Sequence, residues 1–196
     1  MPVTQITLLP GYPPEVRERL VRRVSDAVRS VIAAPAAGTT TFVQEVATYQ
    51  RDGRVFTQGN AAVPVASEQV RAFLAAMQAR DLSLAQTFLS PDFTMCFPGG
   101  ARFNQLAELV AWGRQRYNKI GKHVEQIDEA WTAEHTVVHC HGTLFGEWPD
   151  GQAFEGIRFI DRFEVKGGLL CRQDVWNDLA EHARAAINHR AAPRVG

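Results

Sequence analysis

A proline stands at position 2, directly after the initiator methionine, and it opens a segment typical of a β-strand, Val3 to Leu9. Pro2 is small enough for Met1 to be removed, so we expect the mature chain to begin with a secondary amine. An α-amino group titrates near pH 8, at roughly 7.7–8.0, and an apolar pocket or a nearby cation lowers that value. Such an amine can act as a general base or as a nucleophile towards carbonyls. The alternative is that Pro2 is an ordinary chain terminus.

Acidic side chains on apolar strand faces are a second set of candidates. Side chains of a strand alternate between its two faces, so Asp161 shares a face with Phe159 and Phe163. A buried carboxyl group beside apolar rings can exchange a proton with a neighbouring carbonyl compound. We therefore predict that Asp161 is an acid or base, with Asp174 as the next candidate. The alternative for Asp161 is a buried ion pair with an arginine, and the available arginines are Arg158, Arg162 and Arg172.

Two histidines lie on one face of the strand expected at residues 136–145, with Cys140 on the other face. His141 can polarise a carbonyl, or it can be a core histidine satisfied by a backbone group. His139 and His141 also suggest zinc, but a zinc site needs a third and a fourth ligand. The sequence shows no partner motif at a suitable spacing, so we expect no metal and no cofactor.

The first part of the chain alternates strand, helix and strand. Apolar residues recur at helical spacing from Pro14 to Ala34, and the segment Thr39 to Tyr49 is rich in β-formers. Arg51 to Arg54 reads as a hairpin turn. Two strands joined by a long helix need a crossover connection, so we expect them to pair in parallel.

Residues 2–57 resemble the tautomerase superfamily of the 4-oxalocrotonate tautomerase type. The matching segments are "PVTQITLLPG", "VRERLVRRVSDAVRSVIAAP" and "TTTFVQEVATY". The resemblance implies a βαβ unit in which Pro2 is the general base and which assembles into oligomers. Arginines that bind substrate carboxylates in the family are replaced by Tyr12 and Thr40. Tyr12, Gln44 and Tyr49 would then bind a neutral carbonyl, or Arg51 and Arg54 of an adjacent subunit would restore the charge.

The rest of the chain has helices first and then a run of strands. Residues 58–65 read as a linker, residues 66–190 as a second domain, and residues 191–196 as a tail. Ser67 is expected to cap a helix that ends at Ala79. Further helices are expected at 81–89, at 106–117 and from residue 178, and a strand at 92–97 follows a break at residues 90–91. The order predicts an α+β fold with a curved antiparallel sheet at 123–131, 136–145, 154–165 and 169–176.

Residues 66–182 resemble the SnoaL-like group of the nuclear transport factor 2 fold. The match rests on "VRAFLAAMQARDLSLAQTFLSPDFTMCFPGG", "FNQLAELVAWGRQRY" and "GTLFGEWPDGQAFEGIRFIDRFEVKGGLLCRQDVWNDL". The resemblance implies a cone-shaped α+β barrel with a pocket, and the fold hosts cyclases, isomerases, hydrolases, dehydratases and noncatalytic domains. The aromatic residues expected to line the pocket are Phe97, Trp112, Tyr117 and Trp176.

Composition excludes several partners. The chain has 21 basic and 21 acidic residues, so neither nucleic acid nor an anionic membrane is expected as a partner. No apolar run reaches the length of a membrane span, and no signal peptide is apparent. Three cysteines without paired spacing favour a reducing compartment, and we expect the cytoplasm.

Three functional hypotheses remain open. In the favoured one, an isomerase of tautomerase type transfers a proton next to the carbonyl of a small, largely apolar, neutral substrate, with Pro2, an acid of the cone pocket, or both as base. In the second, the cone pocket alone acts as a cyclase, dehydratase or hydrolase. In the third, the cone binds a small molecule without chemistry. A lone βαβ unit leaves its sheet uncovered, so at least a homodimer is expected.

Overall fold

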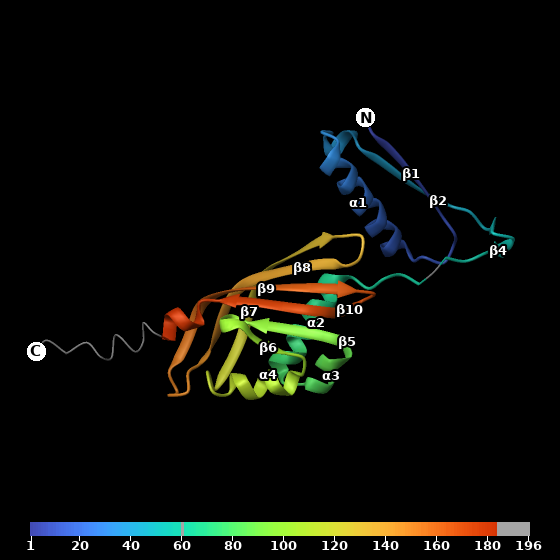
Figure 1. Cartoon of the computed structure of the whole chain (residues 1–196). Coiled ribbons are helices and arrows are strands. Elements are labelled where there is room, and N and C mark those ends of the chain that lie inside the picture. Colours follow the sequence, from blue (N-terminus) through green and yellow to red (C-terminus); the bar gives the residue numbers. More distant parts are fainter. Residues whose placement is uncertain (60, 184–196) are drawn as a thin grey trace, which may run out of the picture. The chain divides into compact units, whose positions relative to one another are not determined.

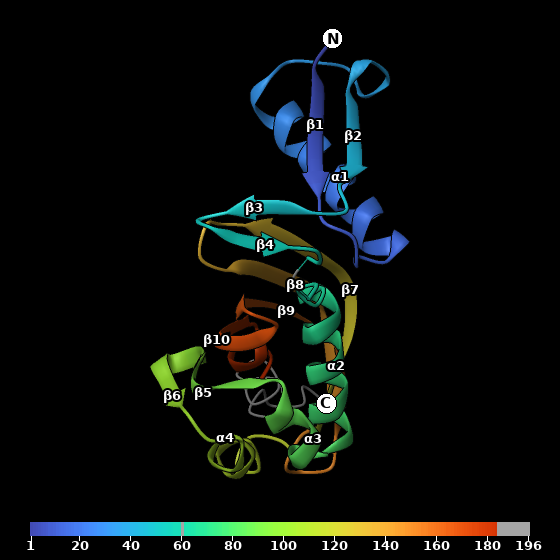
Figure 2. The same ribbon diagram turned by 90° about the vertical axis from the view of Figure 1, so that its right-hand side faces the viewer.

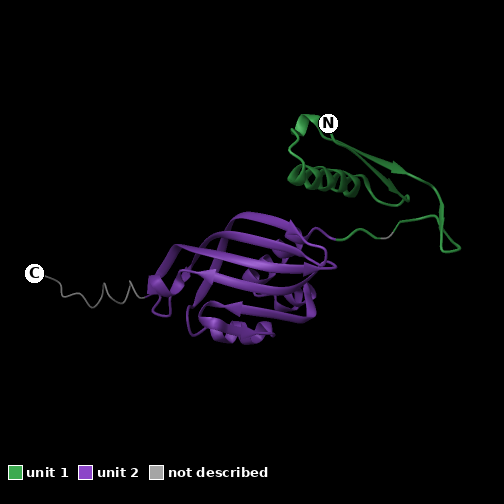
Figure 3. Ribbon diagram, turned by 45° about the horizontal axis from the view of Figure 1, so that its top comes forward, with its two compact units in different colours: residues 1–63 green, residues 64–196 purple. Residues whose placement is uncertain are grey.

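The computed structural model describes residues 1–59 and 61–183. The chain divides into two compact units, residues 1–63 and 64–196 (Figure 3). The predicted tail at 191–196 and the last residues of the predicted 66–190 domain lie outside the described residues. No helix in the described ranges combines the length and apolar character that a membrane span requires.

The first unit is a two-stranded sheet with one long helix. Strands β1 (Val3–Leu8) and β2 (Thr40–Glu45) pair in parallel, and helix α1 (Pro14–Val31) is the crossover between them (Figure 2). The predicted parallel pairing is confirmed. A 3₁₀ turn (Ala36–Gly38) precedes β2, and a hairpin of β3 (Tyr49–Arg51) and β4 (Arg54–Phe56) follows it.

Helix α1 is shorter than predicted. It ends at Val31, and Ile32 already has extended backbone angles, whereas the sequence predicted a helix to Ala34. Pro35 explains the difference because a proline ring clashes with the carbonyl group four residues earlier, which here is that of Val31.

The second unit is a curved six-stranded sheet with helices on one side. The strand order is β6-β5-β10-β9-β8-β7, and helix α2 packs against β7, β8 and β10 (Figure 1). The labelled helices are α2 (Ala66–Ala79), α3 (Leu82–Thr87) and α4 (Leu106–Gly113). Residues 179–183 are also helical, as predicted for the segment that starts at residue 178. The strands are β5 (Leu89–Phe97), β6 (Ala101–Phe103), β7 (Lys119–Trp131), β8 (Thr136–Glu147), β9 (Ala153–Lys166) and β10 (Leu169–Asn177), with a 3₁₀ turn (Pro98–Gly100) before β6.

The sheet is mixed. The antiparallel arrangement predicted for the strands at 123–131, 136–145, 154–165 and 169–176 is confirmed for β7 to β10, whereas the parallel addition of β5 was not predicted. Strands β10 and β5 run parallel, while the other neighbours are antiparallel. Leu170 lies opposite Leu89 but Arg172 lies opposite Thr94, so β5 is irregular between these pairs. Pro91 falls in that irregular stretch, where its missing N–H group costs no ladder hydrogen bond. The predicted break at residues 90–91 is therefore inside a strand.

Two helix ends in this unit also differ from prediction. Ser67 lies inside α2 instead of capping it, and Glu129 Oε1 of β7 accepts the Ser67 N–H at 2.7 Å. The carboxylate of Glu129, which is distant in sequence, thus accepts a hydrogen bond from the start of the helix in place of a local cap. Helix α4 stops at Gly113 instead of continuing to Tyr117, which is consistent with the low helix propensity of glycine.

Candidate functional site

A cavity of about 340 Å³ opens between the helices and the sheet of the second unit. Its deepest walls are apolar and closed to solvent: Phe73, Leu144 and Phe159 are no more than 3% exposed. They come from α2, β8 and β9, whose inward faces form the core. The size and the lining are those of a site for a small organic molecule.

One buried carboxylate lies beneath the cavity wall. Asp161 on β9 is 0% exposed, and its Oδ2 accepts hydrogen bonds from Lys122 Nζ and, at 3.2 Å, from Gln173 Nε2. Asp161 Oδ1 has no hydrogen-bond partner among the described residues. Lys122 and Gln173 line the cavity, and Asp161 lies behind them. The cavity therefore meets an ammonium and an amide that a carboxylate holds in place.

Lys122 also lies against an aromatic ring. Its Nζ is 4.4 Å from the centroid of Phe159, a distance at which the ring face attracts a cation. The ammonium is thus fixed between a carboxylate, a ring and the cavity. Its strand, β7, places Ile120, Lys122 and Val124 on one face.

The negative charge of Asp161 acts on a neighbouring thiol. Cys140 lies opposite Asp161 in the β8–β9 pairing and is fully buried. Burial raises the pKa of Cys140 to about 12, and the charge of Asp161 adds to the increase. Cys140 is therefore a neutral, inert thiol in the core.

Three of the four aromatic residues predicted to line the pocket do so. Phe97, Trp112 and Tyr117 line the cavity, and the rings of Phe97 and Trp112 meet edge to face at 5.7 Å. Burial raises the pKa of Tyr117, and the positive charges of Arg80 and Arg116 offset part of that increase. Its hydroxyl is therefore a neutral hydrogen-bonding group. Trp176 does not line the cavity and is 53% exposed.

Asp174 and His141 lie away from this cavity. On β10, the residues that line it are Gln173, Val175 and Asn177, so the face that carries Asp174 and Trp176 points the other way. The Asp174 carboxylate accepts hydrogen bonds from Arg172 Nε at 2.9 and 3.1 Å. Neither Asp174 nor His141 lines the cavity, so the catalytic roles predicted for them cannot be exercised there.

His141 is only partly buried and shares the outer face of β8 with His139, which is exposed. No group of three or more His, Cys, Asp or Glu side chains in the described ranges is arranged to hold a metal ion.

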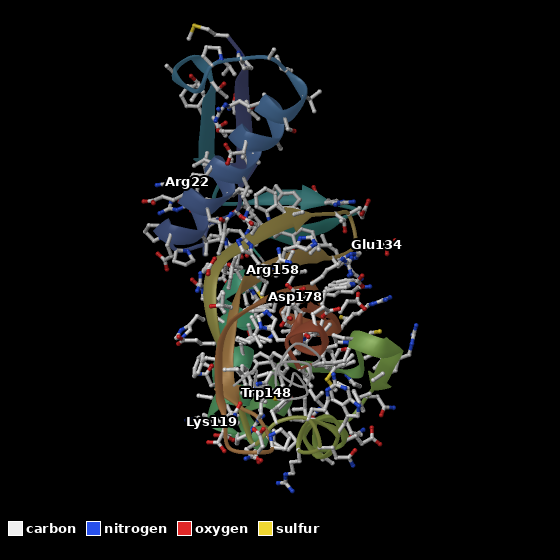
Figure 4. The ribbon with its side chains drawn as sticks, turned by 90° about the vertical axis from the view of Figure 1, so that its left-hand side faces the viewer. Arg22, Lys119, Glu134, Trp148, Arg158 and Asp178 are labelled. Carbon is white, nitrogen blue, oxygen red and sulfur yellow. The ribbon has the colours of Figure 1, made fainter. Side chains whose placement is uncertain are left out.

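The arginines predicted as partners of Asp161 pair elsewhere. Arg158 binds Asp178 at 2.7 Å, and both are labelled in Figure 4. Arg162 and Arg172 bind Asp174. The actual partner, Lys122, was missed because it lies two strands away in the sheet. The available signal was a single lysine between Ile120 and Val124 on an otherwise apolar strand face.

The candidates of the first unit are not brought together within one copy. Pro2 lies before β1, where its carbonyl accepts the N–H of Thr40 at 3.1 Å, and Tyr12 follows the other end of β1. Six strand residues span roughly 20 Å. Tyr12 packs on the α-carbon of Gly59, where an added Cβ would lie 2.4 Å from its ring. Tyr49 stacks on Phe56 at 5.1 Å.

Solved structures with a similar fold cover the second unit. An NTF2-like protein from Burkholderia thailandensis E264 has 17% sequence identity and a TM-score of 0.52, over 63% of this chain and 98% of that chain. TerC, co-crystallised with polyporic acid, has 16% identity and a TM-score of 0.51, over 60% of this chain and 95% of that chain. At these identities the likeness shows the fold alone. No curated protein matches the sequence.

The sequence itself matches a family model over residues 70–173, which is more than half of the 196 residues. The matched region runs from α2 to β10 and so includes the cavity, Lys122, Asp161 and Gln173. The model is that of the SnoaL-like domain, and the chain belongs to this family.

Proposed function

We propose that the cavity binds a small, largely apolar carbonyl compound and promotes transfer of a proton from the carbon next to the carbonyl to a water molecule at the open end of the cavity, which leaves an enolate. One observation carries this proposal: a lysine ammonium, held by a buried carboxylate, faces an apolar cavity. Such a cation stabilises the negative charge that develops on oxygen when an enolate forms. This chemistry is shared by isomerases and by cyclases that close a ring through an enolate.

The setting strengthens the effect of Lys122. A fixed cation in a site that excludes water stabilises developing charge without reorganising at the moment of reaction. Phe73, Leu144 and Phe159 exclude water from the deep part of the cavity. Asp161 and Gln173 keep the ammonium in place, so we assign Asp161 a positioning role in place of the predicted direct proton transfer.

Neutral groups would orient the substrate. Tyr117 is a neutral hydroxyl on the cavity wall, and Phe97 and Trp112 present aromatic surface to a planar ligand. These roles agree with a ligand of few polar groups.

The test is exchange of carbon-bound hydrogen in deuterated water. A panel of cyclic ketones and β-diketones is followed by NMR with the full chain. Because Lys122→Met alone would leave Asp161 unpaired, the variant is the pair Lys122→Met/Asp161→Asn. Loss of a preorganised donor typically costs 10²- to 10³-fold, so exchange should fall by about that factor. Lys166→Gln, at the exposed end of β9, is the charge control.

Two results would contradict the proposal. If the wild-type protein binds members of the panel without accelerating exchange, the cavity is a binding site without chemistry. If the Lys122→Met/Asp161→Asn pair exchanges as fast as the wild type, the ammonium is not the active group.

The first unit supports a second candidate, a tautomerase centred on Pro2. The supporting observation is the parallel β1–α1–β2 arrangement, with Pro2 held at the start of β1 by its bond to Thr40. Intact mass shows whether Met1 is removed, and titration of the amino terminus shows whether its pKa is lowered. A retained Met1 would exclude this activity, because the Pro2 nitrogen would then be an amide.

We further propose that the protein assembles as at least a homodimer and resides in the cytoplasm. The open sheet face of the first unit supports assembly, since the apolar residues Val3 and Phe42 are exposed on it. Cys96, Cys140 and Cys171 are free thiols, which suits a reducing compartment.

A further inference from the structure

The outer part of the cavity carries positive charge without a matching acid. The cationic residues that line it are Arg80, Arg114, Arg116 and Lys122, and no aspartate or glutamate among the described residues lines it. Lys122 is neutralised by Asp161. The charge left over is that of the three arginines.

These arginines lie where the cavity meets solvent. Arg80 and Arg114 are exposed, whereas the deep lining residues Phe73 and Leu144 are almost fully buried. Other arginines of the chain bind a carboxylate, among them Arg17, Arg158 and Arg172. Arg80, Arg114 and Arg116 make no ion pair with any residue that the structure describes.

Two of the three are held in position. The guanidinium carbon of Arg116 lies 4.5 Å from the centre of the Trp112 ring, so one face of the guanidinium is covered, and its N–H edges bind no carboxylate of the described residues. Arg80 caps α2 with a left-handed backbone, φ 61° and ψ 22°. Glycine is the residue that this conformation favours. A strained residue that also lines a cavity is a candidate for function.

We propose that the ligand of this cavity is an acid: a compound with an apolar body, a carbonyl at Lys122, and a carboxylate at its other end bound by Arg80, Arg114 and Arg116. Guanidinium groups bind carboxylates through two parallel hydrogen bonds. In this arrangement Lys122, in the buried part of the cavity, recognises the carbonyl group of the ligand. The arginines at the mouth of the cavity recognise its carboxylate. This inference rests on the proposed function, because it places the reacting carbonyl at Lys122.

The experiment compares two probes that share the ketone and the ring but differ at the carboxyl group, which is ionised in one and methylated in the other. 4-Acetylbenzoate carries both the ketone and the carboxylate, and methyl 4-acetylbenzoate carries the ketone alone. Binding to the full chain is measured by calorimetry at low and high potassium chloride. The benzoate should bind more tightly than the ester, and salt should weaken the benzoate alone.

Variants assign the effect to the arginines. Arg80→Gly relieves the left-handed strain, so it should fold at least as well as the wild type. It should weaken the binding of 4-acetylbenzoate about two- to fivefold, which is the range of an exposed ion pair, and leave the affinity for the ester unchanged. Arg80→Gly/Arg114→Gln should weaken the benzoate roughly tenfold. Lys166→Gln, which removes a positive charge outside the cavity lining, should change neither probe.

The outcomes separate this inference from the proposed function. If the ester binds as tightly as the benzoate, and if Arg80→Gly changes the affinity for neither probe, the proposal that the ligand is an acid is wrong. In that case, loss of binding of both probes in Lys122→Met/Asp161→Asn still supports the carbonyl site. If neither probe binds, or if that pair of substitutions has no effect on either probe, both proposals fail.

Discussion

Asp161 has no contact with solvent, so its carboxylate depends on Lys122 for a compensating charge. Removing one partner of a buried ion pair leaves the other unpaired and costs about 3–5 kcal/mol. We therefore expect Lys122→Met to lower the free energy of unfolding by about that amount, measured by urea denaturation. Lys122 is 22% exposed at its side chain, which favours the lower end of the range.

The double variant is the control for this prediction. Lys122→Met/Asp161→Asn removes both charges, and the asparagine amide can still receive the hydrogen bond from Gln173. It should recover most of the stability lost in the single variant. Equal destabilisation by the single and the double variant would mean that Lys122 contributes by packing on Phe159 instead of by charge.

Cys140 should make the free energy of unfolding decrease as the pH rises above about 9. Its ordinary pKa is 9.0, and burial raises the pKa in the folded chain to about 12. Above about pH 9 the unfolded chain loses this proton while the folded chain keeps it, so the stabilisation present below pH 9 is lost as the pH rises towards 12. The slope is about 1.4 kcal/mol per pH unit.

The measurement compares urea denaturation of the wild type and Cys140→Ala from pH 8 to 10.5. Lysines and tyrosines titrate in both proteins, so their effects cancel in the difference. Cys140→Ala should lose less stability than the wild type over this range, by roughly 2 kcal/mol. If the two proteins lose stability in parallel over this pH range, burial does not raise the pKa of the Cys140 thiol.

The sequence located one of the central residues and missed its partners. Alternation placed Asp161 between Phe159 and Phe163, and these three are indeed buried together on β9. On β10, alternation groups Asp174 with Trp176, but it cannot say which face points inwards because Val175 and Trp176 are both apolar. Lys122 contacts Asp161 across two strand spacings, and no local pattern encodes that contact.

Among the secondary-structure elements, those marked by local sequence signals were predicted correctly, whereas a strand pairing between distant segments was not predicted. The turn residues Asp52 and Gly53 have positive φ angles, as the predicted hairpin requires. The long crossover predicted the parallel β1–β2 pair, which is confirmed. The parallel contact of β5 with β10 joins segments about 80 positions apart in the printed sequence, so turn chemistry gives no indication of it.

Helix α4 positions one cavity wall through a glycine. A Cβ at Gly113 would lie 2.7 Å from Tyr117 Oη and 3.1 Å from its Cζ, so the tyrosine ring must move if the glycine gains a side chain. Gly113→Ala should therefore weaken binding of 4-acetylbenzoate and of its methyl ester by a similar factor, since it changes shape and not charge. Calorimetry measures both constants.

The control for this variant is a glycine with open space. A Cβ at Gly99 would meet nothing within 4 Å, but φ is +84°, so Gly99→Ala adds backbone strain without filling the cavity. It should cost stability and leave ligand affinity near that of the wild type. If Gly113→Ala binds both probes normally, the position of Tyr117 does not matter for the ligand.

At the scale of the whole molecule, the two units differ in how they are stabilised. The buried apolar side chains of the described ranges all belong to residues 66–179. In the first unit α1 contributes no buried residue, and Gly38 is the sole buried position among residues 1–59. A sheet with so little interior needs a further surface to cover it. On the face away from α1, Val3 is 65% and Phe42 is 54% exposed.

A second copy of the same unit would cover this face, because its two exposed strands present matching apolar and amide groups, including the Gln5–Gln44 pair at 3.0 Å. We expect light scattering at micromolar concentration to give at least the mass of a dimer. Phe42→Lys should shift the mass towards the monomer, since it places a charge in the covered face. Leu84→Lys, at a comparably exposed position on α3, should leave the mass unchanged. A monomeric wild-type protein would show that the sheet face stays open and that its strands are stable without a partner.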